Sequence, residues 1–348
     1  MADAVQDSKR TAAAQLAEVL RDRLAPEYGA GTEIEGLVRL SGGASRESWS
    51  FDAHKPDGTR QPLILKRDPM DRQVDKTFEG VPGGRLAVDR MTEGRLIQLA
   101  KAAGAPAPEV PFFLAADGRT TPGFFSHRLA AEALGRRIVR DDAFAQARPK
   151  LAFQIGHAAA CFHGIEGQAL PKMRGLPVGA ELLHYRAIMD SFHQPHAGFE
   201  YGFRWLEERL ELAGDRYTLN HGDFRNGNIL VDENGLAGVL DWESAHLGNP
   251  NLDLGWMCVR AWRYGYHDKV VGGFGDVEEM LDGYDAGGGG RVGAEEIHFG
   301  EVFGTLRWGI LCMILGFTHI DGDQRSVELA AIGRRAAETE FDLMLLLD

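Results

Sequence analysis

The chain has 348 residues, of which 44% are hydrophobic and 26% charged, and its formal net charge is −13 at pH 7. This length and composition are typical of a globular protein with one large or two modest domains. A protein that follows nucleic acid through its phosphates needs a basic face, so the acidic balance argues against a nucleic-acid partner.

The cysteines are few and far apart. No two of them form a C-x-x-C pair, so the pattern predicts neither a disulfide framework nor a zinc site. The three are Cys161, Cys258 and Cys312. Because this usage is typical of a reducing compartment, we expect a cytoplasmic protein.

One segment, Phe299–Phe317, approaches the length and apolar character of a membrane span. Glu301 and Arg307 interrupt it and four glycines punctuate it, so a buried helix is the better interpretation. The polar, amphipathic start of the chain, Met1–Arg23, lacks the continuous apolar stretch of a signal peptide. We therefore expect no membrane partner.

The first third of the chain predicts a small sheet with two helices. Apolar residues at helical spacing predict a helix over Ala13–Leu24 that ends before Pro26. Short apolar runs separated by glycine and aspartate turns predict five strands. The strands are at Leu37–Leu40, Ser48–Phe51, Leu63–Lys66, Val110–Leu114 and Gly123–Leu129, and a second helix is at Leu86–Ala103. We expect residues 1–129 to form a five-stranded antiparallel lobe with one main helix.

After about residue 130 helical periodicity dominates, so residues 130–348 are expected to form a mostly helical second lobe. The clearest helical segments are Asp142–His163, Glu181–Phe192 and Tyr201–Leu212. One exception is Asn228–Asp241, where two apolar runs flank an Asp-Glu-Asn-Gly turn and predict a hairpin. The expected fold class is therefore α+β with two lobes.

The loop before this hairpin carries residues suited to phosphoryl transfer. It reads His221-Gly222-Asp223-Phe224-Arg225-Asn226-Gly227-Asn228, and Asp241 ends the hairpin. Transfer of a phosphoryl group needs a carboxylate for the acceptor and oxygen ligands for magnesium, and this stretch offers both in order. The alternative is a surface turn, since Asn, Asp and Gly favour turns for backbone reasons alone.

These motifs, together with a lysine at the end of the third strand, make the chain resemble the aminoglycoside phosphotransferase and choline kinase group of small-molecule kinases. It looks closest to the kinase-like domains fused to acyl-CoA dehydrogenases, judged on Val239–Pro250 and Val259–Arg263. The resemblance implies a two-lobed protein-kinase-like fold. It also implies an enzyme that uses ATP and Mg²⁺ to phosphorylate a hydroxyl group of a small molecule.

Carried over residue by residue, the resemblance makes Asp223 the catalytic base and Asn228 and Asp241 the magnesium ligands. Lys66 would hold the α- and β-phosphates, which its place at the end of a strand also suggests. Glu93, on the following helix, would pair with Lys66. Asp89 is the alternative partner, and a solvated helix charge is the alternative role of Glu93.

The glycine-containing turn after the first strand would lie over the phosphates, where small residues allow close backbone approach. This turn is formed by Gly42, Gly43, Ala44 and Ser45, and a plain hairpin is the alternative interpretation. Adenine would bind backbone groups of the segment that contains His127 and Leu129. Ala131 stands where relatives of this group tend to carry glycine.

Two further residues are expected to shape the catalytic loop rather than to react. His221 is interpreted as structural, orienting the loop by hydrogen bonding. Asp253 resembles the position that braces the loop in this group, although a charge at a helix N-terminus would explain it equally well.

The class of acceptor is the least determined part of the sequence. The arginines of 135–140, with Arg260 and Arg263, favour an anionic metabolite such as a hydroxyacyl-CoA. An aminoglycoside or an amino alcohol is not excluded. The alternative functions are a nucleotide-binding pseudokinase or regulator and, less favoured because no A-P-E segment follows Asp241, a protein kinase.

Overall fold

The computed structural model describes residues 2–40, 47–70, 88–322 and 325–347, with side chains from Ala13 onward. These residues form two compact units. The first contains the described residues 2–40, 47–70, 89–101 and 108–130. Residues 102–107 belong to the second unit together with residues 131–348, and there the Val239 N–H donates to the carbonyl oxygen of Pro106 at 2.8 Å.

The first unit contains the expected five-stranded antiparallel sheet, whose strand order is β1-β2-β3-β5-β4. The strands are β1 (Glu33–Arg39), β2 (Glu47–His54), β3 (Arg60–Arg67), β4 (Phe112–Leu114) and β5 (Gly123–His127). The first three form a meander, as predicted, while β4 begins two residues later and β5 ends two residues earlier than the apolar runs indicate. The α+β fold class is confirmed.

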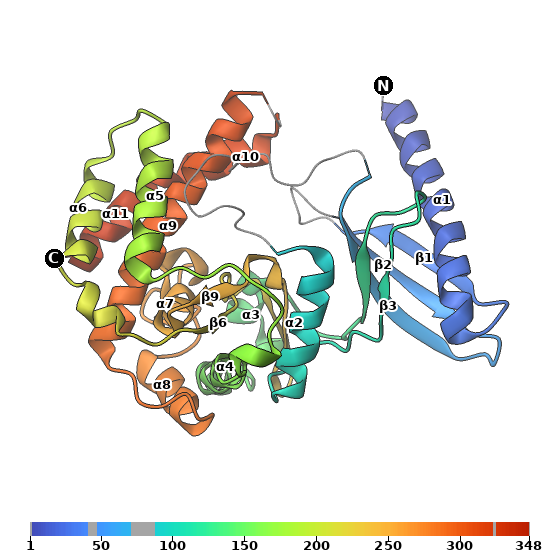
Figure 1. Ribbon diagram of the computed structural model, residues 1–348, viewed down its shortest axis with the longest axis horizontal. Helices are drawn as coiled ribbons and strands as arrows, with labels where there is room; N and C mark the ends of the chain where they lie inside the picture. Colours follow the sequence, from blue (N-terminus) through green and yellow to red (C-terminus); the bar gives the residue numbers. More distant parts are fainter. Residues whose placement is uncertain (1, 41–46, 71–87, 323–324, 348) are drawn as a thin grey trace. The chain divides into compact units, whose positions relative to one another are not determined.

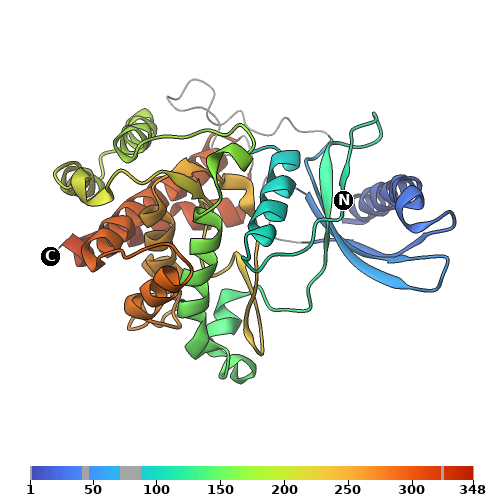
Figure 2. The ribbon, with the colours of Figure 1, turned by 60° about the horizontal axis from the view of Figure 1, so that its bottom comes forward.

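Alternation along the strands sends neighbouring side chains to opposite faces of this sheet. Leu65 and Phe125 are paired across β3 and β5 and pack on the face covered by α1 (Ala2–Tyr28). In both views α1, in blue, lies beside the sheet (Figures 1 and 2). The next pair, Lys66 and Phe124, faces the other way, toward α2 (Arg90–Ala102). There a Cβ on Gly94 would lie 2.6 Å from the Phe113 ring, so glycine allows α2 its close approach.

The prediction that the first helix ends before Pro26 is wrong, because α1 continues to Tyr28. Proline removes one backbone donor and crowds the preceding turn, yet the helix continues for two residues beyond it. The helix ends instead at Gly29, whose φ of 106° suits glycine, and its N–H donates to the Ala25 carbonyl at 2.9 Å.

The second unit is mostly helical, as predicted. Its helices are α3 (Gly135–Arg140), α4 (Arg148–His163), α5 (Val178–Ser191), α6 (Ala197–Glu207), α7 (Pro250–Cys258), α8 (Val277–Ala286), α9 (Ala294–Ile320), α10 (Val327–Gly333) and α11 (Arg335–Leu347). The periodicity places the start of α4 six residues too early, because Asp142–Phe144 forms a separate 3₁₀ turn. It also runs α6 five residues too far, into a second short 3₁₀ segment at Leu210–Ala213.

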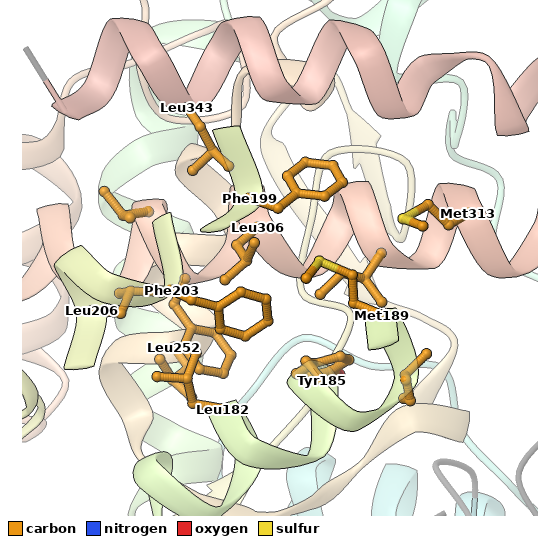
Figure 3. Close-up of a cluster of buried hydrophobic side chains, with 14 of the residues drawn as sticks. Leu182, Tyr185, Met189, Phe199, Phe203, Leu206, Leu252, Leu306, Met313 and Leu343 are labelled. Carbon is orange, nitrogen blue, oxygen red and sulfur yellow. The ribbon is translucent and has the colours of Figure 1, made fainter. Parts of the chain in front are cut away.

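A large apolar core lies among α5, α6, α9 and α11 (Figure 3). Its labelled members include Tyr185 and Met189 of α5, Phe199 and Phe203 of α6, Leu306 and Met313 of α9, and Leu343 of α11. Within the described part of the chain, α9 is the one helix long and apolar enough to cross a membrane by length and composition, and half of its most apolar window is buried. A helix at the centre of a protein core passes the same test, in agreement with the buried helix predicted here.

Two small antiparallel pairs of strands frame the predicted catalytic loop. The expected hairpin is present as β7 (Ile229–Asp232) and β8 (Gly235–Val239). Sequence reasoning missed the other pair, in which β6 (Thr218–Asn220) bonds with β9 (His246–Gly248). The loop joins β6 to β7, so both of its ends are held by backbone hydrogen bonds.

Candidate active site

The loop from His221 to Asn228 is curled by two glycines in the positive-φ region. Gly222 has a φ of 78° and Gly227 a φ of 125°. A Cβ on Gly222 would lie only 2.2 Å from the carbonyl oxygen of Ser244, which is backbone and cannot move aside cheaply. Glycine is therefore required at this position by both conformation and space.

The Asp223 carboxylate accepts three hydrogen bonds inside the second unit. Its Oδ1 accepts from the Arg225 Nε at 3.0 Å and from the indole Nε1 of Trp256 at 2.9 Å. Its Oδ2 accepts from the amide Nδ2 of Asn228 at 2.5 Å. The side chain stays 25% exposed, so a small molecule can still approach it.

Asn228 and Asp241 are brought together by the backbone of the hairpin. The Leu240 N–H donates to the carbonyl oxygen of Asn228 at 2.8 Å, which places the next residue, Asp241, beside it. Asp241 adopts the left-handed conformation, with φ 68° and ψ 59°, which aspartate tolerates better than most residues. The Nδ2 of Asn228 is used by Asp223, so its Oδ1 is the atom suited to a cation.

The donor set fits magnesium better than a metal held by protein alone. Within the described ranges, no three His, Cys, Asp or Glu side chains gather closely enough to hold a metal ion. Magnesium in phosphoryl-transfer sites typically takes one or two protein oxygens and completes its shell with water and phosphate oxygens. One carboxylate and one amide, from Asp241 and Asn228, match that requirement, and their role as ligands stays a prediction.

Asp253, in the first turn of α7, contacts the backbone of the loop, which is the position that the resemblance implies for it. Its carboxylate accepts the backbone N–H of His221 at 2.5 Å and that of Gly222 at 2.9 Å. His163 of α4 lies 3.3 Å away through its Nε2. Burial works to raise the pKa of Asp253, but the hydrogen bonds that it accepts from His163 and from the Gly222 N–H favour the ionised carboxylate, and its pKa is lowered. The carboxylate therefore stays ionised and holds two loop amides.

His221 is fully buried and its two ring nitrogens are both engaged with the backbone. The Nε2 lies 2.8 Å from the Leu240 carbonyl, to which it donates, and the Nδ1 accepts the Asp223 N–H at 3.2 Å. This pattern requires the neutral imidazole with its proton on Nε2. The geometry agrees with the structural role predicted for His221.

The two buried histidines make the stability of the protein depend on pH. Burial lowers the pKa of both His163 and His221 from 6.5, so each binds a proton at a lower pH in the folded protein than in the unfolded chain. The unfolded chain binds these protons near pH 6.5, so the stabilising contribution is present above that pH and is lost as the pH falls. We expect the free energy of unfolding to drop by up to about 1.4 kcal/mol per pH unit for each histidine.

Urea unfolding between pH 7.5 and 5.5 would measure this dependence. A His163→Gln variant removes one titrating group and should show a shallower loss of stability toward low pH than the wild type. The matched control is His157→Gln, which changes an exposed histidine on the same helix. Equal pH slopes for wild type and His163→Gln would contradict the assignment.

In the first unit, Lys66 pairs with Glu93, as predicted. The Lys66 Nζ lies 3.1 Å from the Glu93 Oε1, and the glutamate is completely buried. Arg90, one helical turn before it, contacts the other carboxylate oxygen. Asp89, the alternative partner, instead begins α2 by accepting the Thr92 N–H at 2.9 Å. The predicted cofactor lysine is thus oriented by a buried, doubly paired glutamate.

The other residues predicted to contact the nucleotide are only partly described by the structure. Gly42, Gly43, Ala44 and Ser45 lie outside the described residues. The backbone N–H of His127 already donates to the Glu109 carbonyl at 2.8 Å, so this donor is engaged within the sheet unit. Leu129 follows the end of β5 and is partly buried. The binding of adenine by the backbone at His127 and Leu129 stays a prediction.

The expectation that Arg263 lines an anion pocket is wrong. Its guanidinium is buried and bonds to Glu301 and to the carbonyl oxygens of Cys258 and His267. Arg260 is also paired, with the Asp342 carboxylate at 3.1 Å from its Nε. Arg263 therefore joins α7 to α9, because a buried guanidinium needs partners for its donors, and the partly exposed Arg260 contacts α11.

The contact missed by sequence reasoning is the one from Trp256 to Asp223. The tryptophan is 1% exposed and its sequence neighbours are apolar, so it reads as a core residue. One signal could have identified it: Trp256 follows Asp253 by three positions, and residues three apart share a helix face. If Asp253 braces the loop, Trp256 must face the loop as well.

The chain is similar to a known protein family and to several solved structures. Residues 36–289 match the model of the phosphotransferase enzyme family. No curated protein matches the sequence.

Among solved structures, a Ralstonia eutropha JMP134 protein assigned to the aminoglycoside phosphotransferases has a TM-score of 0.69 at 15% identity, covering 94% of this chain and 97% of that one. The macrolide 2'-phosphotransferase MphH from Brachybacterium faecium has a TM-score of 0.58 at 17% identity, with 92% and 97% covered. The aminoglycoside phosphotransferase APH(4)-Ia, in complex with ADP and hygromycin B, has a TM-score of 0.58 at 12% identity, with 94% and 97% covered. At these identities the likeness concerns the fold.

Proposed function

The chain belongs to the phosphotransferase enzyme family, and from this premise we propose that it is a small-molecule kinase that transfers the γ-phosphate of ATP, with Mg²⁺, to a hydroxyl group. The observation that carries the proposal is the Asp223 carboxylate, which is held by three donors yet remains partly exposed, with Asn228 and Asp241 adjacent along the same hairpin. Phosphoryl transfer depends mainly on positioning and charge stabilisation, and this arrangement supplies both.

In this proposal each residue has one task. Asp223 accepts a hydrogen bond from the acceptor hydroxyl, orients its oxygen toward the phosphorus and takes its proton. Asn228 and Asp241 would hold the cation through an amide oxygen and a carboxylate oxygen. Magnesium bound there would neutralise charge that develops on the transferred group.

The first unit would bind the nucleotide. The ammonium group of Lys66 would bind the α- and β-phosphates. Glu93, which also contacts Arg90, keeps this ammonium group in place. The residues 42–45 and the backbone at Leu129 complete the proposed contacts to phosphate and adenine. Two of the solved relatives support nucleotide use: one contains ADP and another contains GDP.

For the acceptor we propose an anionic, hydroxyl-bearing metabolite such as a hydroxyacyl-CoA. Arg225 lies beside Asp223, and α3 begins against the same loop, because a Cβ on Gly135 would lie 2.8 Å from the Asn226 side-chain oxygen. The exposed Arg136 follows on that short helix. Cationic side chains at this end of the loop favour an anion. Aminoglycosides and amino alcohols are the competing acceptors, and solved relatives bind hygromycin B or kanamycin.

The experiment is a screen for ATP consumption across hydroxyacyl-CoAs, aminoglycosides, amino alcohols and sugars, with product confirmed by mass spectrometry. We expect acceptor-dependent formation of ADP that stops when EDTA removes Mg²⁺. An Arg136→Ala variant should raise KM for an anionic acceptor, whereas saturation by a cationic antibiotic would contradict the anion proposal. Binding of MgATP without transfer to any acceptor would indicate a nucleotide-binding regulator instead.

A further inference from the structure

One oxygen of the Asp223 carboxylate is held from outside the loop by a buried tryptophan. The Trp256 indole N–H donates to the Asp223 Oδ1 at 2.9 Å, and the ring is 1% exposed on α7. We propose that Trp256 is a positioning residue for phosphoryl transfer, fixing the Asp223 carboxylate so that its Oδ2 faces the acceptor hydroxyl. This inference rests on the proposed function of Asp223.

The contact belongs to a closed ring of four side chains. Arg225 donates to the same Oδ1 at 3.0 Å, and its guanidinium lies over the Trp262 ring at 4.7 Å from the centroid. Trp262 in turn packs against Trp256, with centroids 5.3 Å apart and planes at 56°. Each link restrains the next, because neither indole can rotate without losing a ring contact. The rotamer of Asp223 is thereby fixed from two sides.

A second arginine ties Trp256 to the backbone of the loop. The Arg307 guanidinium lies over the Trp256 ring at 4.5 Å, and its Nη2 donates to the Gly222 carbonyl at 2.6 Å. A cation on the face of an indole is attracted to the ring and polarises it, which strengthens its N–H as a donor to a carboxylate. Trp256 of α7 thus holds Asp223, while Arg307 of α9, stacked on its ring, holds the neighbouring Gly222.

The hydrogen-bond geometry leaves a defined place for the acceptor. A carboxylate offers about four lone-pair directions, two on each oxygen. Oδ1 uses both of its directions for Arg225 and Trp256, and Oδ2 uses one for Asn228. The remaining direction on Oδ2 is the one that can receive a hydroxyl. Without the indole N–H, the carboxylate could rotate and lose this orientation.

The kinetic test compares Trp256→Phe with Trp308→Phe. Phenylalanine keeps an aromatic ring under Arg307 but removes the N–H donor. Trp308 is a matched control, because its indole nitrogen is buried without a hydrogen-bond partner among the described residues. A hydrogen bond to a charged group is worth enough to predict a ten- to hundred-fold fall in kcat for Trp256→Phe. KM for ATP should stay within two-fold of wild type, and Trp308→Phe should retain full activity.

The rate is measured for transfer to the acceptor found in the screen and for hydrolysis of MgATP, in which water takes the place of the acceptor. A kcat of Trp256→Phe within two-fold of the Trp308→Phe value would overturn the proposal. If the wild type shows neither reaction, it is the proposed function that fails. The contact between Trp256 and Asp223 is therefore tested separately.

Nitrogen-15 NMR of the six tryptophan indoles provides that separate test. The signal that Trp256→Phe removes identifies the Trp256 N–H, and it should lie downfield, as expected for a donor to a carboxylate. In Asp223→Ala this signal should move upfield by far more than the other indole signals. A Trp256 signal that does not respond to Asp223→Ala would show that the hydrogen bond is absent, whether or not the enzyme is active.

Discussion

Replacing Asp223 by alanine should lower kcat by about a thousand-fold while leaving the Kd for MgATP within about three-fold of wild type. The carboxylate touches Arg225, Trp256 and Asn228, all within the second unit, and its proposed task concerns the acceptor hydroxyl rather than the nucleotide. Loss of orientation and proton acceptance therefore appears in the chemical step. Turnover with the identified acceptor and calorimetric titration with MgATP measure the two quantities.

The control for this variant is Asp215→Ala, which removes an exposed carboxylate from the loop that leads to β6. It should behave as wild type in both measurements. Added magnesium should not rescue Asp223→Ala, because the residue is not proposed to hold the cation. Turnover of Asp223→Ala within ten-fold of wild type would remove Asp223 from its proposed role.

Those parts of the site that depend on local patterns could be predicted from the sequence. Strand alternation determines that Lys66 faces away from Leu65, and helical spacing places Glu93 one turn into α2. The same reasoning identified the hairpin with Asp241 after it, since a turn signal lies between two apolar runs. These assignments need only the period of each element and the residue types on its faces.

Contacts between elements distant in sequence could not be predicted in the same way. Arg263 has the composition of a substrate-binding residue, and its burial against Glu301 depends on the crossing of α7 and α9. For Trp256 the error is the opposite one. Its apolar helix predicts a core residue, yet its indole N–H donates to Asp223, which lies 33 residues earlier in the chain. A sequence shows which donors a side chain carries, but the partners follow from packing.

Asp241→Asn should lower kcat at ordinary Mg²⁺ concentrations by about a thousand-fold, because it removes the carboxylate of the proposed cation site and leaves only amide oxygens. Asparagine tolerates the left-handed conformation that Asp241 adopts at φ 68°, so the backbone should not change. The remaining ligands still bind the cation weakly, so activity should partly recover as Mg²⁺ is raised. Titration of turnover against Mg²⁺ measures this recovery.

The Mg²⁺ titration separates the two carboxylates by function. Asp241→Asn should show a right-shifted dependence on Mg²⁺, whereas Asp223→Ala should lose activity at every concentration, because its defect lies with the acceptor. The control Asp215→Asn keeps the wild-type dependence. A wild-type midpoint for Mg²⁺ in Asp241→Asn would exclude Asp241 as a ligand and would leave Asn228 without its carboxylate partner. Only the role of Asp223 toward the acceptor hydroxyl would then remain for this part of the chain, and other residues would have to bind Mg²⁺.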